Sequence, residues 1–407
     1  MIHYMTTQGV GDAWVGNELR VVTGAGIPVR LHALNRPQST YFTAPDIDAL
    51  NRATNVIYPL SPLRALGAAL AAPFRFGPRR AFGALWNALT GPRESARIRL
   101  TGLWHYAVAC HWAAGLRGEQ VDHIHSQWIH SGGTVAMYGA WLLGRPYSFT
   151  GHAADLFRNR AALEDKIRRA QFIICISEFH RQFFLDNGAR PEQLHIAYCG
   201  IDTSHFTPRR RTRAEGEPLH ILSSGRLVDK KGFDVLIDAC ALLRDQNYPF
   251  RCTIAGSGPL DSDLRARIAA AGLDDRVSMT GEALKQEDIP AFMSSGDVYC
   301  LPCVWAKDND VDGLPQMLME AMACGLPAIS TRLVGIPDLV IDGETGLLVA
   351  PESAEALAEA LMRLGEDEPL AQQLASSGHT HVTKSFDIDT CLEPLLRQFR
   401  MALESRS

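Results

Sequence analysis

The stretch from Asp312 to Gly325, DGLPQMLMEAMACG, follows an apolar run at 298–302, typical of a short buried strand, and then a polar loop. Gly313 lets the backbone approach a ligand closely, Pro315 suits the first position of a helix, and Gly325 suits the helix end. The order strand, loop, helix start predicts an open α/β sheet. At the carboxyl edge of such a sheet, unpaired N–H groups and the positive end of the helix dipole favour an anion.

Two carboxylates of this stretch, Asp312 and Glu320, stand eight positions apart. A carboxylate repels a phosphate, so neutral donors such as sugar hydroxyls suit these side chains better. Both oxygens of Glu320 can accept from a vicinal diol, the group that a ribose presents. A nucleotide sugar carries both an anionic diphosphate and such hydroxyls. The alternative is an ordinary helix start with acids at the surface.

Length and composition predict a globular protein of two domains. The chain has 407 residues, of which 46% are hydrophobic and 21% charged, as in ordinary globular proteins. This length suits two α/β domains of about 200 residues each. No apolar run reaches the length of about 18 residues that a spanning helix needs, and the first residues lack the layout of a signal peptide. We therefore expect a cytoplasmic protein.

The nine cysteines are scattered without the spacing of a disulfide framework, which predicts reduced thiols. Cys300 and Cys303 form a lone CxxC, but no second pair accompanies them. We interpret these two residues as buried strand-end side chains rather than as a zinc or redox site.

Charge is spread unevenly along the chain. Residues 1–200 carry 20 Lys and Arg against 13 Asp and Glu, whereas the rest carries 20 against 32, which fits two domains of opposite sign. The segment Arg52–Arg99 holds eight arginines and one acid, Glu94, among Leu, Ala, Phe and Trp. Such a segment can lie on an anionic membrane surface at the inner face of the membrane. The alternative is a pair of core helices with solvated arginines. Nucleic acid is not expected, because the chain is acidic overall and shows no stacking platform.

The first half alternates between strand and helix patterns. A loop with Gly9 and Gly11 precedes a helix that ends near residue 24; it does not match a dinucleotide fingerprint but remains a candidate ligand-facing loop. His123 and His125 share one face of a predicted strand, without further ligands at a matching offset, so a metal site is not expected there. His152 directly follows a strand, at the edge where sites in such sheets form.

The domain boundaries follow from composition. We expect a first domain over 1–203, a polar, Arg-rich linker over 204–218, and a second strand–helix alternation over 219–385. The final segment, 386–407, contains an amphipathic helix expected to pack back on the first domain.

Two cations on one loop of the second half suit a diphosphate. Arg226 and Lys231 lie five positions apart among glycines, and without a metal a diphosphate needs two such charges. A solvated basic loop is the alternative. The triplet Asp308–Asp310 is spaced like a metal motif, but its polar loop favours exposure to solvent, so no metal site is expected.

Three segments closely resemble the retaining glycosyltransferases of family 4, which have the GT-B fold: GRLVDKKGFDVLIDA (225–239), IAGSGPL (254–260) and DGLPQMLMEAMACGLPAISTRLVGIPDLVIDGETGLLV (312–349). In the first half, VDHIHSQW, GRPYSFTGHAADLF and ISEFHRQFF are similar to bacterial exopolysaccharide members of the colanic acid type. The resemblance covers nearly the whole chain. It implies an α/β protein with two Rossmann-like α/β/α domains facing across a cleft.

The resemblance also implies roles for single residues. Arg226 and Lys231 would hold the donor diphosphate, aided by the helix start at Pro315, and Glu320 the ribose. The remaining contacts are expected as follows: the donor sugar at Asp312, Gly313 and Leu314, the transferred sugar opposite His152, and the base along Gly281, Ala283 and Leu284. Arg226, Lys231, His152 and Asp312 are thus the expected catalytic residues. In the family the first carboxylate is usually Glu, so Asp312 is one methylene shorter here.

The implied reaction moves a sugar from a nucleotide diphosphate sugar to an acceptor hydroxyl, with retention at the anomeric carbon and without a cofactor or essential metal. The expected acceptor is a glycan or lipid-linked glycan of exopolysaccharide, capsule or lipopolysaccharide synthesis. Two alternatives stay open: a nucleotide-sugar 2-epimerase, which needs no acceptor, and a non-catalytic nucleotide-sugar sensor.

Overall fold

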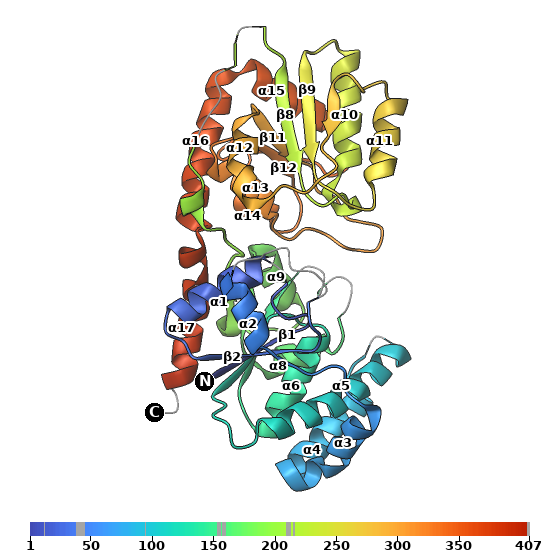
Figure 1. The fold of residues 1–407 in the computed structure, drawn as a ribbon, viewed down its shortest axis with the longest axis vertical. Helices are drawn as coiled ribbons and strands as arrows, with labels where there is room; N and C mark the ends of the chain where they lie inside the picture. The colour runs from blue at the N-terminus through green and yellow to red at the C-terminus, as the bar shows by residue number, and fades with distance from the viewer. Residues whose placement is uncertain are drawn as a thin grey trace. The chain divides into compact units, whose positions relative to one another are not determined.

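The computed structural model describes residues 1–11, 13–37, 45–93, 95–152, 156, 160–208, 213–214 and 216–404. The chain divides into two compact units (Figure 1). The first contains Met1–Tyr198 and Leu392–Ser407, and the second contains Cys199–Cys391.

The first unit is built on a parallel sheet whose central strands are buried. In spatial order the sheet contains β3 (Asn55–Val56), β2 (Val29–Ala33), β1 (Ile2–Thr6), β4 (His123–Ser126), β5 (Tyr147–Gly151), β6 (Ala170–Cys175) and β7 (Leu194–Ile196). Its helices are α1 (Ala13–Gly24), α2 (Pro45–Ala53), α3 (Pro62–Phe76), α4 (Pro78–Thr90), α5 (Ala96–Gly115), α6 (Ser131–Leu143), α8 (Leu163–Arg169), α9 (Glu178–Asp186) and most of α17 (Ile388–Glu404). Strands β1, β4 and β5 are buried along their whole length although their sequences alternate apolar and polar residues, so both faces of the central sheet are covered.

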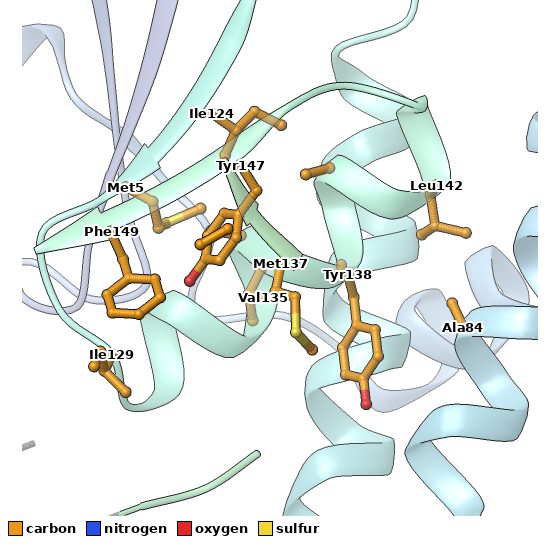
Figure 2. Close-up of a cluster of buried hydrophobic side chains, with 14 of the residues drawn as sticks. Met5, Ala84, Ile124, Ile129, Val135, Met137, Tyr138, Leu142, Tyr147 and Phe149 are labelled. Atoms are coloured by element: carbon orange, nitrogen blue, oxygen red, sulfur yellow. The ribbon is translucent and has the colours of Figure 1, made fainter. Parts of the chain in front are cut away.

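The core of this unit joins the sheet to helices α4 and α6. Figure 2 shows Met5 and Ile124 of the sheet, Met137 and Tyr138 of α6 and Ala84 of α4, which all belong to one buried cluster. Helices α3, α4 and α5 pack against one another and continue this core outward from α6.

The second unit is a second parallel sheet with its own helices. Its strands are, in spatial order, β10 (Val277–Met279), β9 (Phe250–Ala255), β8 (Leu219–Ser224), β11 (Val298–Leu301), β12 (Ala328–Thr331) and β13 (Leu347–Val349). Its α-helices are α10 (Phe233–Asp245), α11 (Asp261–Ala270), α12 (Ile289–Ser294), α13 (Gln316–Ala323), α14 (Ile336–Leu339), α15 (Ala354–Glu366) and α16 (Glu368–Ser385).

Each sheet reverses its strand order once. The reversal lies between β1 and β4 in the first unit and between β8 and β11 in the second. In open α/β sheets, ligands bind beyond the carboxyl ends of the strands at such a reversal. The fold therefore points to the loops after β1 and β4 and, in the second unit, to those after β8 and β11.

The unit boundary falls before the linker expected at 204–218. Ile201 forms an isolated bridge with Asp387, and the Thr203 hydroxyl donates to the Asp387 carboxylate at 2.6 Å. These bonds attach the residues just before the expected linker to the second unit. The other boundary, between Cys391 and Leu392, lies inside helix α17.

One local expectation differs from the structure. Pro315 is the extended N-cap of α13 rather than its first residue, and the helix begins at Gln316. Helix α16 covers a segment to which we assign no element from the sequence. Over the part of the chain that the structure describes, no helix is both long and apolar enough to cross a membrane.

Candidate functional site

The loops after β8 and β11 bring together two lysines and an aspartate. Lys231 closes the turn of 3₁₀-helix Asp229–Lys231, which follows β8, and its ammonium group forms an ion pair with Asp312 in the loop after β11. Lys230 lies 3.1 Å from the other oxygen of Asp312 and 3.3 Å from Asp310. Two cations and two carboxylates therefore meet at the strand reversal of the second unit.

Backbone contacts hold these two loops together. The Val304 N–H donates to the Lys230 carbonyl at 3.0 Å. Gly232 caps the lysine turn at φ +66°, and a Cβ on it would lie 1.9 Å from the Pro302 carbonyl oxygen. Only glycine fits this position, because the backbone is left-handed and the next loop leaves no room.

The electrostatics of the cluster keep all three groups charged. Burial opposes the charge on Lys231, but the Asp312 carboxylate outweighs it and raises the pKa of the lysine. Burial likewise opposes the charge on Asp312, yet Lys231 and Lys230 lower the pKa of its carboxyl group. A phosphate arriving here meets lysines that are already protonated and that share their charge with Asp312.

Glu320, on the buried face of α13, is held beside this cluster by one hydrogen bond. The Gln286 side chain donates to its Oε1 at 3.2 Å, whereas Oε2 is buried and has no partner among the described residues. Burial raises the pKa of Glu320 to about 7, partly offset by the Gln286 hydrogen bond. An orphaned carboxylate oxygen in an apolar setting is costly, which suggests that a ligand donor completes it.

The other predicted donor-site residues occupy the loops around this cluster. The Arg226 side chain is exposed, in the loop after β8. Gly313 accepts a backbone hydrogen bond from Gly335 at 3.0 Å, and Leu314 is buried beside it. Gly281, Ala283 and Leu284 precede Gln286, which contacts Glu320. The loop expected to line the base is therefore linked to the predicted ribose carboxylate.

In the first unit, His152 lies at the end of β5 in an aromatic enclosure. The rings of Trp14 and Trp128 lie 4.3 and 4.7 Å from its ring, centroid to centroid. The Gln127 side-chain nitrogen lies 3.4 Å from His152 Nε2. Burial lowers the pKa of His152 to about 3, and nearby histidines add to the effect, so the imidazole is neutral at physiological pH.

Gln127 also connects His152 to a buried acid. Its side chain donates to Glu18 Oε2 at 3.1 Å, and the Tyr4 hydroxyl lies 2.5 Å from Glu18 Oε1. Burial raises the pKa of Glu18 to about 7, against the hydrogen bonds from Tyr4 and Gln127. These residues come from β1, α1 and the end of β4, so the network lies at the strand reversal of the first unit.

The candidate loop with Gly9 and Gly11 follows β1 at the same reversal. Asn51 of α2 holds it: its side chain accepts from the Val10 N–H at 3.0 Å and donates to the Val10 carbonyl at 2.9 Å. Gly9 has φ +63° and lines a cavity of about 510 Å³ together with Arg36 and Arg52. Gly11 lies two residues further along the same loop.

The histidine pair and the CxxC cysteines considered as metal ligands are both buried inside their units. His123 Nε2 and His125 Nδ1 lie 2.6 and 2.8 Å from the Ser148 hydroxyl, inside the sheet. Cys300 and Cys303 are buried and free. In the described part of the chain, no group of three or more His, Cys, Asp or Glu side chains could hold a metal ion.

The loop Asp308–Asp310 has the expected exposure at 308 and 309, whereas Asp310 is partly buried. The Asp310 carboxylate also forms an ion pair with Lys230, which the sequence does not predict. The two residues are 80 positions apart, so the pair arises only when the loops after β8 and β11 meet.

Three groups of residues escape the sequence reasoning. Lys230 shares Asp312 with Lys231, Gln286 positions Glu320, and Gln127 with Glu18 supports His152. Only Lys230 has a signal in the sequence, since it adjoins Lys231; the others depend on contacts between residues far apart along the chain.

Comparison with known proteins places these units in a family. Residues 206–381 match the family model "Glycosyl transferases group 1", and residues 24–205 match "Glycosyltransferase Family 4". The chain is 35% identical over 223 residues to the amylovoran biosynthesis glycosyltransferase AmsK of Erwinia amylovora, covering 53% of this chain and 54% of that protein. It is 39% identical over 194 residues to the putative colanic acid biosynthesis glycosyltransferase WcaL of Escherichia coli K12, covering 48% and 47%. These matches span about half the length of those relatives.

A longer match is to the D-inositol 3-phosphate glycosyltransferase of Pseudarthrobacter chlorophenolicus, 30% identical over 311 residues, covering 69% of this chain and 72% of that one. Among solved structures, a glycosyltransferase from Rickettsia africae superposes with a TM-score of 0.71 at 14% identity, covering 99% and 98% of the two chains. Anabaena Alr3699/HepE in complex with UDP-glucose superposes with a TM-score of 0.66 at 17% identity over both whole chains. These structures confirm the predicted GT-B fold class. The two family models and the 30% identical relative show that this chain belongs to the family 4 glycosyltransferases.

Proposed function

We propose that the chain transfers a sugar from a nucleoside diphosphate sugar to an acceptor hydroxyl, with retention at the anomeric carbon and without an essential metal. The observation that carries the proposal is the cluster of Lys230, Lys231 and Asp312 beside the orphaned Glu320 oxygen, at the strand reversal of the second unit. Lysines offer charge to a diphosphate, and Glu320 offers an acceptor to a ribose diol. The relatives named above, all glycosyltransferases, support the same class of reaction.

The slow step in such a transfer is loss of the nucleoside diphosphate from the anomeric carbon. Negative charge then develops on the leaving phosphate oxygen. Lys231 and the exposed Arg226 belong to the loop after β8 and can stabilise that charge. Asp312, which holds Lys231 now, would exchange part of this pairing for the hydroxyls of the donor sugar.

Retention requires the acceptor oxygen to bond to the anomeric carbon on the face that the diphosphate leaves. The leaving phosphate oxygen can take the acceptor proton on that face, so no protein base is needed. His152 is neutral, and its ring nitrogen can accept or donate one hydrogen bond to a sugar hydroxyl. Gln127 and Glu18 would act on the reaction only by positioning His152.

We further propose a lipid-linked glycan of surface-polysaccharide synthesis as the acceptor, at the inner face of the membrane. AmsK and WcaL are named for amylovoran and colanic acid biosynthesis, and both names support an exopolysaccharide pathway. The donor base is left open, because the names and titles of relatives include GDP-mannose for some and UDP-glucose for others.

A thermal-shift titration with UDP, GDP, ADP and CMP in EDTA tests the donor site. We expect one nucleoside diphosphate to raise Tm in the wild type and not in Glu320→Ala, because the mutant loses the diol acceptor. Glu287→Ala, on the exposed turn next to Gln286, is the matched control and should keep the shift. A requirement for divalent metal would refute the metal-free site.

Turnover tests the reaction itself. Arg226→Ala should slow sugar transfer by about two orders of magnitude or more, because it removes charge from the leaving group. Arg244→Ala, which removes an arginine paired with Asp245 at the surface of α10, should leave turnover unchanged. If Arg226→Ala retains near wild-type turnover, the assignment is wrong. Product analysis with and without acceptor separates transfer from epimerisation, and slow donor hydrolysis without acceptor would exclude a pure sensor.

A further inference from the structure

Helices α3 and α4 reverse the usual arrangement of large and small apolar residues. On α3 the buried positions are Ala65, Ala68 and Ala72, and on α4 they are Ala81, Ala84 and Ala88. A helix of a globular protein normally buries its large apolar side chains and exposes polar ones. Here the small side chains let the helices pack closely on their neighbours, and the large ones are left outside.

The outer faces carry leucine, phenylalanine and tryptophan at helical spacing. On α3, Leu63, Leu66, Leu70 and Phe74 are exposed, Phe74 to 92%. On α4, Phe82, Trp86 and Leu89 are exposed, Trp86 to 67%. Among the described residues, eight of the twelve exposed large hydrophobic side chains lie on α3, α4 and the start of α5. A concentration of this kind marks a surface that contacts an apolar medium or partner.

The three helices lie next to one another, so the exposed side chains belong to one part of the unit (Figure 1). Hydrogen bonds from the end of α4 and the segment after it fix this part to helices α6 and α8. The Arg93 guanidinium forms a buried ion pair with Asp165 at 2.9 Å and donates to the Tyr138 hydroxyl at 2.9 Å. Asn87 of α4 donates to the same carboxylate at 2.9 Å. The outer face of α3 and α4 is therefore preformed rather than created on binding.

The charged side chains on α3 and α4 themselves all have one sign. Neither α3 nor α4 contains an acidic residue, and Arg64, Arg75 and Arg79 are exposed on or beside them. Arg97, at the start of α5, is exposed as well. Arginines with leucine, phenylalanine and tryptophan are the composition of helices that lie in the interface of an anionic bilayer.

We propose that the outer face of α3 and α4, defined by Leu63, Leu66, Leu70, Phe74, Phe82 and Trp86, docks on an anionic lipid bilayer. The helices lie along the interface, since their 15 and 13 residues are fewer than the roughly 20 that a spanning helix needs. The apolar side chains enter the acyl boundary and the arginines contact lipid phosphates. This surface goes beyond the transfer reaction and needs neither donor nor acceptor to bind.

Vesicle flotation tests the proposal on the full chain. We expect binding to phosphatidylglycerol–phosphatidylcholine vesicles at about 50 mM salt, and much weaker binding at about 500 mM salt or to phosphatidylcholine alone. Phe74→Ser and Trp86→Ser should each lower the vesicle partition coefficient about tenfold. Arg64→Ala and Arg75→Ala should each lower it about fivefold on anionic vesicles. Phe179→Ser, at an exposed apolar position on α9, is the matched control and should change little.

Two further measurements separate lipid docking from a loss of folding in the variants. The substituted side chains are exposed, so Tm should match that of the wild type; quenching of Trp86 fluorescence by brominated lipid, measured against Trp86→Phe, reports insertion without the serine variants. The proposal is overturned if the wild type does not bind, or if the serine variants bind as well as the wild type. It is also overturned if these variants instead abolish a dimer seen by light scattering without vesicles. Nucleotide binding is measured without vesicles, so the transfer reaction and the docking surface can fail independently.

Discussion

Replacing Glu320 by Gln should stabilise the ligand-free protein, and the gain should depend on pH. The side chain is buried, and its pKa rises from 4.5 to about 7 on folding. Because the folded state keeps the proton that the unfolded chain loses, the stability of the wild type falls as pH rises from about 4.5 to about 7 and stays low above that. Glutamine keeps the shape and the neutral state at every pH.

The size of the effect follows from the shift of about 2.5 pKa units, at 1.36 kcal/mol per unit. The wild type loses about 1 kcal/mol at pH 5 and about 3 kcal/mol at pH 8, relative to a neutral side chain. Glu320→Gln should therefore gain about 2 kcal/mol more at pH 8 than at pH 5. The hydrogen bond from Gln286 can re-form to the amide oxygen, so its loss does not dominate.

Urea unfolding of both proteins at pH 5 and pH 8, without nucleotide, measures this difference. The same variant should bind nucleoside diphosphate more weakly at pH 8, since an amide accepts a diol less well than a carboxylate. A stability difference that is the same at both pH values would show that folding does not raise the pKa of Glu320. It would thereby refute the argument that burial, rather than a partner, governs this carboxyl group.

Two other predictions concern the same loops. Asp312→Asn leaves Lys231 without its carboxylate and should lower the free energy of unfolding of the ligand-free protein by about 2 to 4 kcal/mol. Adding nucleoside diphosphate should then raise Tm more than in the wild type. An unchanged Tm of the ligand-free variant would contradict the ion pair. Gly232→Ala should lower the free energy of unfolding in urea by about 2 to 5 kcal/mol, because the new Cβ meets the Pro302 carbonyl. Gly272→Ala has the same left-handed backbone but open space around it, and should lower it by only about 1 to 2 kcal/mol. Equal losses would mean that the contact with Pro302 is unimportant.

The sequence predicts most of the strands because parallel strands are buried on both faces and are bounded by glycine or polar turns. The strand expected over the apolar run at 298–302 is found as β11, Val298–Leu301. Helix α16 is not predictable in this way: serine, threonine and glycine fill much of it, and its few apolar residues, such as Leu374 and Val382, gain their burial from the rest of the unit. Local preference is weak there, and tertiary packing decides.

The site residues likewise fall into those that the sequence identifies and those that only the tertiary structure shows. Lys231, Asp312 and Glu320 stand out in the sequence because each lies in a short motif with glycine or proline nearby. Their partners do not: Gln286 is 34 residues from Glu320. Gln127 is 109 residues from Glu18. Side-chain hydrogen bonds of this kind depend on which loops the strand order brings together. The spacing of residues along the chain does not predict that strand order.

The first unit is built from two separate parts of the chain, because most of helix α17 returns to it after the second unit. This order affects how the first unit folds during synthesis and whether it can be produced alone. The Phe399 side chain is fully buried, with ring contacts to His123, His125 and Phe172 of the sheet. During synthesis the sheet residues that Phe399 contacts lack this cover until the chain has been made past residue 399, after the whole second unit. A fragment ending at Tyr198 would lack it permanently, so we expect an isolated first unit to be more stable when 392–404 is joined to it through an engineered connection.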